Sequence, residues 1–447
     1  MKSIPVLAMV LIANLLPAQE VLQQYIATGL ENNLALKQKE AGYRLSLEVL
    51  KEAHGLFYPA VSVNARYSIA DGGRVIAFPI GDLLNPVYST LNQLTASNQF
   101  PQVENQEFAF LRPHEQDTKL RLAQPLFNPE IYYNSMIKKE LVGYEECSVD
   151  QYKRALTAEI KKAYYQVLMM ERLLAMLQET RKLLVENVRV NEALVGSGKL
   201  TRDNVLRSQT ELGKFDRQLL EVVQNKQTAA AYFNFLLNKP LSDSIMVEEP
   251  AMMPENPTGN NFSEKALAGR EEIRMLENYN NITALHVKMN KAAALPGIFM
   301  LVDYGFQGEK YAFNREQDYL QASVVLSWNL FQGFQNRAKI NQSLAQKEMA
   351  EIQLAEAREK ISLEVINAVL ALNTSEAGVS EAGSRVRSAR EGFRLVQRKY
   401  QEGQASLVEF MDARSALTQA EANLIISRFG YLSDIAEFER ASTIEIQ

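Results

Sequence analysis

The chain has 447 residues with 53 acidic and 48 basic side chains, and its net charge of −5 gives no support for nucleic-acid binding. Its length alone would allow two or three globular domains, but the distribution of proline favours a few very long elements. No proline lies between Pro129 and Pro240 or after Pro296. Because proline inside a helix costs about 3 kcal/mol, these two stretches, rich in Ala, Leu, Glu, Lys and Arg, are expected to be uninterrupted helix.

The first residues have the pattern of a secretory signal peptide. Lys2 precedes an apolar run from Ile4 to Leu16, and a cleavage site is predicted near Ala18. The alternative is an N-terminal core helix. The run is shorter than the roughly 20 residues of a membrane-spanning helix, and no other stretch approaches that length, so any membrane insertion has to use strands. Cys147 is the only cysteine, which excludes a disulfide framework and argues against a lipid anchor.

Four segments alternate apolar and polar residues, as strands with one polar face do. The first follows a helical stretch predicted from about Val21 to His54, and Pro59 and Pro296 precede the two strand pairs. The loop at about 71–117 is long, and the loop at about 307–318 is short. The apolar faces contain Val61, Val63, Ala65, Tyr67 and Ile69; Leu120, Leu122 and Leu126; Ile298, Met300, Val302, Tyr304 and Phe306; and Leu320, Ala322, Val324, Leu326, Trp328 and Leu330.

These segments have about the length of a tilted membrane strand, which needs roughly 9 to 11 residues. Tyr58, Trp328 and Phe331 lie near strand ends, where aromatic residues of a membrane interface are expected. The same alternation would suit a soluble antiparallel sheet with one face on a core. The signal peptide favours an outer-membrane barrel. Four strands are too few to close a barrel, so several chains have to pool their strands.

The polar face of the first two segments carries three basic residues, Arg66, Lys119 and Arg121. In a barrel this face would line the lumen, and the three residues would form a basic ring. In a soluble sheet they would pair with carboxylates. The alternation does not decide between these two interpretations.

Each half of the chain contains a strand pair, a long helix, a glycine tip and a return helix. The tip glycines, Gly198 and Gly403, lie 205 residues apart and precede the similar runs 201–212 and 406–417. A period of this length indicates a duplicated half-protein rather than a solenoid. The long helices are predicted at about 131–195 and 335–401, and the return helices at about 201–238 and 406–440.

A coiled-coil seam is expected along the long helices, because apolar residues recur there at spacings of three, four or seven. In the first helix these are Ile160, Ala163, Val167, Leu174, Leu177, Leu184 and Val188, and in the last they are Leu417, Ala420, Leu424, Tyr431, Ile435 and Phe438. The predicted organisation is a signal peptide at 1–18, a first structural repeat at 19–238, a proline-containing linker at 239–261, and a second repeat at 262–447 that opens with a helix over about 262–293.

This order of features resembles the TolC-type outer-membrane efflux proteins over essentially the whole chain beyond the signal peptide. The resemblance rests on the doubled glycine tip, the strand-entry prolines, and the strand exits at 124–127 and 329–333. It implies a mainly α fold in which long antiparallel helical hairpins form an α-barrel and each chain contributes four strands to a shared trimeric 12-stranded β-barrel. The implied function is that of an outer-membrane channel-tunnel in a tripartite efflux or type I secretion system.

The resemblance also implies partners and a location. The partners are two further copies in a homotrimer, outer-membrane lipid, a periplasmic adaptor, and an inner-membrane pump or ABC transporter. The location is the outer membrane, with a helical extension into the periplasm. Adaptors of this family dock on the helical tips, whose residues here are Gly196, Gly198, Lys199, Leu200, Gly403 and Ser406.

Proteins of this family close the periplasmic end of the tunnel with acids just after the second tip, in a pattern like Gly-x5-Asp-x2-Asp. The matching residues are Glu409 and Asp412, so the first position departs from the pattern, and Ala405 stands where some relatives have an arginine. Three copies of each acid would form rings that favour cations. The alternative is a solvated helix face near an N-terminus, where acids are favoured in any case.

No group of residues indicates an enzyme, a metal site or a cofactor. The segment 196–199 resembles a phosphate loop, but Ala193 replaces its first glycine and Leu200 follows the lysine. The histidines His54, His114 and His286 lack metal-ligand spacing, and packing is favoured over a soft-metal path for the dispersed methionines. The alternative function from another class is a soluble periplasmic coiled-coil scaffold or adaptor protein.

Overall fold

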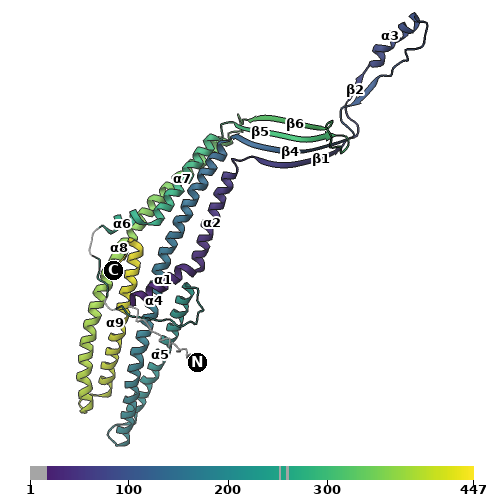
Figure 1. Ribbon diagram of the computed structural model, residues 1–447. Coiled ribbons are helices and arrows are strands. Elements are labelled where there is room, and N and C mark those ends of the chain that lie inside the picture. Colours follow the sequence, from purple (N-terminus) through teal and green to yellow (C-terminus); the bar gives the residue numbers. More distant parts are fainter. Residues whose placement is uncertain (1–17, 251–252, 258–260, 447) are drawn as a thin grey trace, which may run out of the picture. The chain divides into compact units, whose positions relative to one another are not determined.

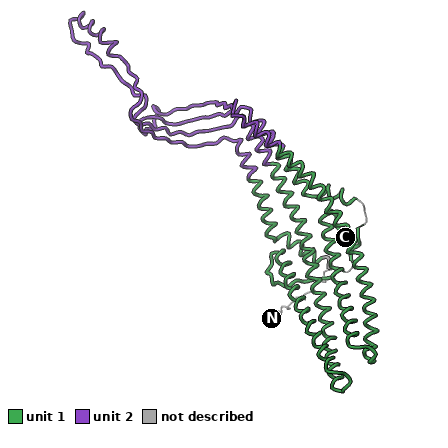
Figure 2. The backbone as a smooth tube through the Cα atoms, turned by 180° about the vertical axis from the view of Figure 1, so that it is seen from behind, with its two compact units in different colours: residues 1–48, 139–283, 345–447 green, residues 49–138, 284–344 purple. Residues whose placement is uncertain are grey.

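The computed structural model describes residues 18–250, 253–257 and 261–446, and it divides into two compact units (Figures 1 and 2). Unit 1 comprises residues 1–48, 139–283 and 345–447. Unit 2 comprises residues 49–138 and 284–344. The predicted signal peptide lies outside the described residues except for Ala18, where the first helix begins.

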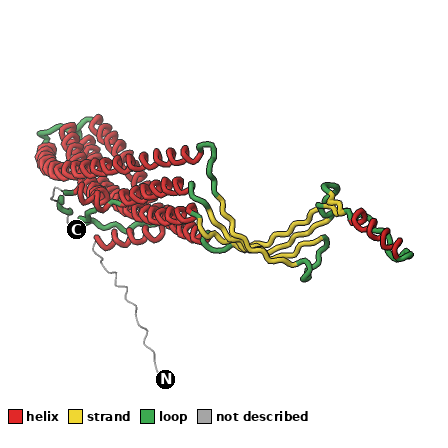
Figure 3. Tube along the Cα trace, turned by 90° about the horizontal axis from the view of Figure 1, so that it is seen from above, coloured by secondary structure: helices red, strands yellow, loops and turns green. Residues whose placement is uncertain are grey.

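Unit 1 is built from helices, and unit 2 contains all the strands of the described chain (Figure 3). The helices of unit 1 are α1 (Ala18–Asn32), α2 (Leu34–Gly55), α4 (Pro129–Gly196), α5 (Arg202–Leu236), α6 (Phe262–Gly269), α7 (Glu271–Ala292), α8 (Gln335–Gln401) and α9 (Leu407–Ser442). One end of each of α2, α4, α7 and α8 belongs to unit 2. No helix among the described residues is both long enough and apolar enough to cross a membrane.

The two long hairpins have nearly equal dimensions. Helices α4 and α5 have 68 and 35 residues, and α8 and α9 have 67 and 36. At 1.5 Å per residue, α4 and α8 are each about 100 Å long. Both hairpins begin and end within a few residues of the predicted positions, because proline-free sequence of high helix propensity meets no competing signal.

The core of unit 1 forms where α1, α4, α5 and α9 pack around large buried side chains. Ile160, Tyr164, Phe233 and Phe438 are all fully buried. The hydroxyl group of Tyr164 donates to the carbonyl oxygen of Glu248 at 3.1 Å and accepts from the amide of the same residue at 2.8 Å. This pair of bonds fastens the linker, whose described residues are non-helical as predicted, to the middle of α4.

Two predicted helices are interrupted in the structure. The break between α1 and α2 is at Asn33, whose side chain accepts from the amide of Leu36 at 3.0 Å and donates to the carbonyl of Leu236 at 2.9 Å. The break between α6 and α7 is at Arg270, whose buried guanidinium group binds Glu272, Glu364 and the carbonyl of Ala441. At Asn33 the side chain supplies a cap to the helix that follows, a local bond that competes with continued helix.

Unit 2 contains a four-stranded antiparallel sheet in the order β1-β4-β5-β6. The strands are β1 (Ala60–Ile69), β4 (His114–Phe127), β5 (Gly297–Gly308) and β6 (Asp318–Ser327). Pro59 and Pro296 directly precede β1 and β5, as predicted. The prediction was wrong for Trp328 and Leu330, which lie beyond the end of β6. There the indole nitrogen of Trp328 donates to the carbonyl of Ala294 at 2.9 Å.

The register of the strands aligns the predicted apolar residues on one face. Leu120 pairs with Val63 and Tyr304, and Tyr304 pairs with Leu320. The exposed fractions of Val61, Val63 and Leu320 are 61%, 72% and 73%. Within the described part of the chain, the sheet therefore has an uncovered apolar face, and its outer strands β1 and β6 each have one edge without a neighbouring strand.

The loop predicted at about 71–117 is folded in the structure. It contains strands β2 (Val75–Phe78) and β3 (Gln106–Ala109), which pair in antiparallel orientation, and helix α3 (Ile80–Leu94) between them (Figure 1). We refer to residues 70–113 as the arm. Its Asn, Gln and Pro content led to a loop assignment, although the sequence of α3 has helical periodicity.

Both hairpin tips have the same backbone geometry. Gly198 and Gly403 have φ values of +72° and +76°. The amide of Lys199 donates to the carbonyl of Leu194 at 2.9 Å, and the amide of Gln404 donates to the carbonyl of Lys399 at 2.7 Å. These bonds define a Schellman motif, which ends a helix with a left-handed residue, usually glycine.

Replacing Gly198 or Gly403 with alanine should destabilise the tip concerned, because the left-handed conformation costs an L-residue roughly 1–2 kcal/mol. Amide hydrogen exchange at the altered tip should become about tenfold faster. The matched control is Gly213→Ala, since Gly213 lies inside α5 with open space around it. Alanine is the better helix former there and should slow exchange. If amide hydrogen exchange at each tip is equally fast with and without the substitution, the left-handed conformation does not carry the expected cost.

Candidate functional site

A groove lies between the first turns of the two return helices, α5 and α9. Its volume is about 500 Å³, and its lining includes Asp203, Leu206, Arg207, Val408, Met411 and Asp412. Leu206 and Val408 are exposed large apolar side chains in this groove. The predicted tip residues, which lie in the preceding turns, do not line it. The groove combines apolar surface with charges of both signs, as a protein-docking surface does.

The two predicted gate acids have different surroundings. The side chain of Asp412 is exposed and lines the groove. The carboxylate of Glu409 accepts from the amide of Ser406 at 2.7 Å, while the hydroxyl of Ser406 accepts from the amide of Glu409 at 3.2 Å. This is a capping box, which satisfies two backbone donors at the start of α9. The alternative interpretation, an acid favoured by a helix N-terminus, therefore describes Glu409.

The cap has an electrostatic consequence. The hydrogen bond from the backbone amide of Ser406, followed by the bond from its hydroxyl, lowers the pKa of Glu409 from its ordinary value of 4.5. A lowered pKa means that the folded helix start favours the ionised form. The stabilisation is present above pH 4.5 and is lost as the pH falls through the lowered value.

A buried polar network joins the two hairpins near their tips. The side-chain amide of Asn191 donates to Ser208 at 2.6 Å and to Asn187 at 3.0 Å, and its oxygen accepts from the hydroxyl of Tyr400 at 2.8 Å. Asn191 is fully buried. The network thus connects α4 with α5 and with α8, and it places one hydrogen bond directly between the hairpins.

A buried arginine lies near this network. The guanidinium group of Arg414 donates to the hydroxyl of Thr180 at 2.7 Å and stands 5.3 Å from the ring centroid of Phe393. Its Nε has no hydrogen-bond partner among the residues that the structure describes. Burial lowers the pKa of Arg414. These two contacts connect α9 with α4 and with α8. The positive charge of Arg414 is only partly compensated there.

The sequence analysis missed this network, although the sequence contained a signal. Asn191 follows Leu177 and Leu184 at intervals of seven residues, and Asn187 follows Leu173 and Thr180 in the same way. A polar residue on a coiled-coil seam is a known device for fixing register at a cost in stability. A search for polar residues on the predicted seam would have found Asn191, which lies seven residues after Leu184.

The basic residues predicted for the polar strand face lie close to carboxylates. Lys119 binds Asp117 at 2.8 Å, and Arg121 binds Asp303 across the β4–β5 pair at 2.7 Å. Arg66 stands opposite Asp117 in the register of β1 and β4. The charges on this face are therefore mixed rather than purely basic. That this face lines a lumen remains a prediction.

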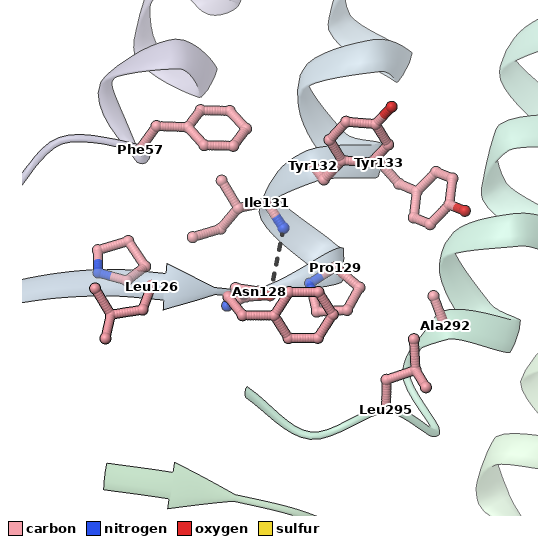
Figure 4. A pocket seen from close by; sticks show the side chains of 11 residues that line it. Phe57, Leu126, Asn128, Pro129, Ile131, Tyr132, Tyr133, Ala292 and Leu295 are labelled. Atoms are coloured by element: carbon pink, nitrogen blue, oxygen red, sulfur yellow. Dashed lines mark hydrogen bonds between the residues drawn. The ribbon is translucent and has the colours of Figure 1, made fainter. Parts of the chain in front are cut away.

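An apolar pocket of about 350 Å³ lies where β4 continues into α4 (Figure 4). The side chain of Asn128 caps α4, accepting from the amides of Glu130 at 2.9 Å and Ile131 at 3.4 Å, and Pro129 occupies the first helical position. The lining includes Phe57, Phe127, Tyr132, Tyr133 and Leu295. No group of three or more potential ligand residues among the described side chains could hold a metal ion.

Glu409→Gln should preserve the capping box, because glutamine occupies this position of the motif equally well, whereas Glu409→Ala should break it. We therefore expect faster amide exchange in the first turn of α9 for the alanine variant alone. In the unmodified chain the protection of this turn should decrease below pH 4.5, and in Glu409→Gln it should not. The first turn of α5 is the internal reference, because its N-cap Thr201 makes no side-chain cap bond. Equal behaviour of both variants would refute the capping role.

Asn191→Ala should leave the hydroxyls of Tyr400 and Ser208 without their buried partner, which costs about 1–3 kcal/mol. Amide exchange in the tip-proximal part of α4 should become roughly tenfold faster or more. Asn225→Ala is the matched control, since Asn225 is exposed on α5. If both variants exchange like the unmodified chain, the network contributes nothing to the hairpin contact.

Comparison with known proteins identifies the fold. Residues 262–433 match the family model described as outer membrane efflux protein. The alkaline protease secretion protein AprF of Pseudomonas aeruginosa is 21% identical over 322 residues, which cover 70% of this chain and 66% of AprF, slightly less than two thirds of its length.

Solved structures match a larger part of this chain than AprF does. The outer membrane protein VceC of Vibrio cholerae matches with a TM-score of 0.77 at 13% identity, covering 96% of this chain and 98% of VceC. The CmeC outer membrane channel of Campylobacter jejuni matches with a TM-score of 0.77 at 14% identity, covering 94% and 85%. The matched family consists of channels rather than enzymes. Residues 262–433 match the outer membrane efflux protein family, the chain has the fold of the TolC-type outer-membrane channels, and its location is the outer membrane.

Proposed function

We propose that the chain is the channel-tunnel of a tripartite efflux or type I secretion system. It acts as a passive exit duct for substrates that an inner-membrane pump and a periplasmic adaptor deliver. The observation that carries this proposal is the four-stranded sheet with an uncovered apolar face and two open edges, joined in one chain to two helical hairpins of about 100 Å. The name of AprF supports secretion as one of the two activities.

The proposed assembly is a homotrimer. Neighbouring strands of the sheet alternate in direction, so β6 of one copy is antiparallel to β1 of the next when the open edges meet. Three copies supply 12 strands, an even number within the range of bacterial barrels. The near-equal lengths of the two hairpins support the further proposal that the halves 19–238 and 262–447 arose by duplication.

In this barrel the apolar face contacts lipid and the polar face lines the lumen. Arg66, Lys119 and Arg121 then lie in the lumen beside Asp117 and Asp303, which makes the lumen mixed in charge. The exposed aromatic residues at the helix-side ends of the strands, Tyr58, Trp328 and Phe331, form the interface girdle.

The tips are the proposed docking site for the adaptor. The groove between α5 and α9 offers exposed Leu206 and Val408 together with charged residues. We assign the gate charge mainly to Asp412, because the carboxylate of Glu409 is bound to its own helix start. A ring of three Asp412 side chains narrows the duct and favours cations.

A soluble scaffold or adaptor was the alternative from another class. The match of residues 262–433 to the efflux family and the strand pairs of membrane length favour the duct. Recovery of the protein as a soluble monomer, rather than as a heat-sensitive oligomer in the outer-membrane fraction, would overturn the proposal.

Planar-bilayer conductance of the purified protein tests both the duct and its gate. We expect discrete cation-preferring steps from the unmodified protein and a lower cation preference in Asp412→Asn, because that variant lacks the ring of three negative charges that favours cations. Glu409→Gln is the control that removes a charge but preserves the cap, and it should change the steps less. If neither variant changes the conductance steps, the protein is still a duct, but the assignment of the gate is wrong. Absence of steps from a folded preparation would remove the duct.

A further inference from the structure

The arm has a rigid internal structure. The side chain of Asn85 donates to the carbonyl of Val103 at 3.0 Å and accepts from its amide at 2.8 Å. Asn92 forms the same two bonds with Phe100, at 2.8 and 3.2 Å. One face of α3 is thereby fastened to the returning segment. The helix is held in place by the arm itself and needs no partner for its order.

Another face of α3 is apolar and uncovered. Leu83, Val87 and Leu94 have exposed fractions of 70%, 52% and 78%, and Thr90 completes a stripe with spacings of four, three and four residues. This is the spacing of a coiled-coil seam, which packs against another helix. We call these four residues the α3 stripe. Single exposed apolar residues are common on protein surfaces, but a continuous seam of them indicates a binding surface.

The charged residues of the arm indicate which kind of partner the α3 stripe can bind. Helix α3 contains a single charged residue, Asp82, and no lysine or arginine. The arm as a whole has two arginines, Arg74 and Arg112, against four carboxylates. Helices that lie on anionic lipid surfaces are instead rich in lysine and arginine on their polar face. An uncharged seam is self-complementary, because copies of it approach one another without repulsion.

We propose that the partner of the α3 stripe is the same stripe of the neighbouring copies, so that three α3 helices pack in parallel at the outer end of the assembly. This inference rests on the proposed trimer. The arm continues directly from β1, whose open edge adjoins the next copy in that trimer, so the stripe extends an interface that the barrel already requires. Each α3 is about 22 Å long, which gives two to three turns of seam contact beyond the strands.

Symmetric cross-linking tests the proposal. A parallel bundle places each seam residue next to its own copies, so Val87→Cys and Leu94→Cys should form interchain disulfides under mild oxidation in intact outer membranes. Ser89→Cys is the matched control, because Ser89 is exposed but lies about 200° around the helix from Val87. All variants carry Cys147→Ala, which removes the one native thiol, a free and buried one. We expect at least tenfold more disulfide-linked dimer for the two stripe positions than for the control.

The outcomes separate this inference from the proposed function. A heat-sensitive trimer without disulfides at Val87 and Leu94 leaves the duct intact and overturns the packing of α3. A monomer overturns both. Labelling of the stripe cysteines by a photoactivatable phospholipid in place of disulfide formation also overturns the proposal, since it assigns the stripe to lipid. Two stripe positions are used so that a folding defect in one leaves the other to decide.

Discussion

Every backbone N–H and C=O group in the hydrocarbon of a membrane needs a partner within the protein, because lipid offers none. In this chain the inner strands β4 and β5 satisfy that requirement on both sides, whereas β1 and β6 each have one open edge. In the proposed barrel, these edges, more than any side chain, make a single copy incomplete as a membrane protein. The proposed trimer closes them without adding a residue, and it sets the symmetry that the helical hairpins and the arm then have to follow.

The helical unit meets a different requirement, which is to keep two long hairpins in register. Apolar seams stabilise such contacts. They also tolerate a shift of one helix along the other, because one leucine can take the place of the next in the packing. Asn191, bonded to Tyr400 across the hairpins, removes that tolerance near the tips. Arg414 adds a second tie at a higher cost, since its Nε is buried without an acceptor. Both contacts lie close to the groove that is proposed to bind the adaptor. The tips therefore combine a fixed register with hydrogen bonds that are easily broken.

The features that the sequence predicted well are those with a strong local signal. Proline-free sequence defined α4 and α8, alternation with a period of two defined the sheet, and glycine marked both tips. The breaks at Asn33 and Arg270 could not be predicted in this way, because their partners Leu236 and Ala441 lie 203 and 171 residues away. The fold of the arm was hidden by its composition, since Asn and Pro usually indicate loops. In α3 the asparagines instead make the bonds that fasten the helix.

At the candidate site, sequence pattern located Glu409 but did not determine its role. An acid three residues after a serine at a helix start fits both a gate motif and a capping box, and only the bonds to Ser406 distinguish them. The two roles are linked in the proposed duct. While the first turn of α9 is intact, the carboxylate of Glu409 is held by its own backbone. Any adaptor contact that unwinds this turn breaks the cap and frees three carboxylates beside those of Asp412. Opening of the tunnel would then leave its net charge unchanged, because these carboxylates are already ionised, but it would release them from their backbone donors, so that they become available to cations in the duct.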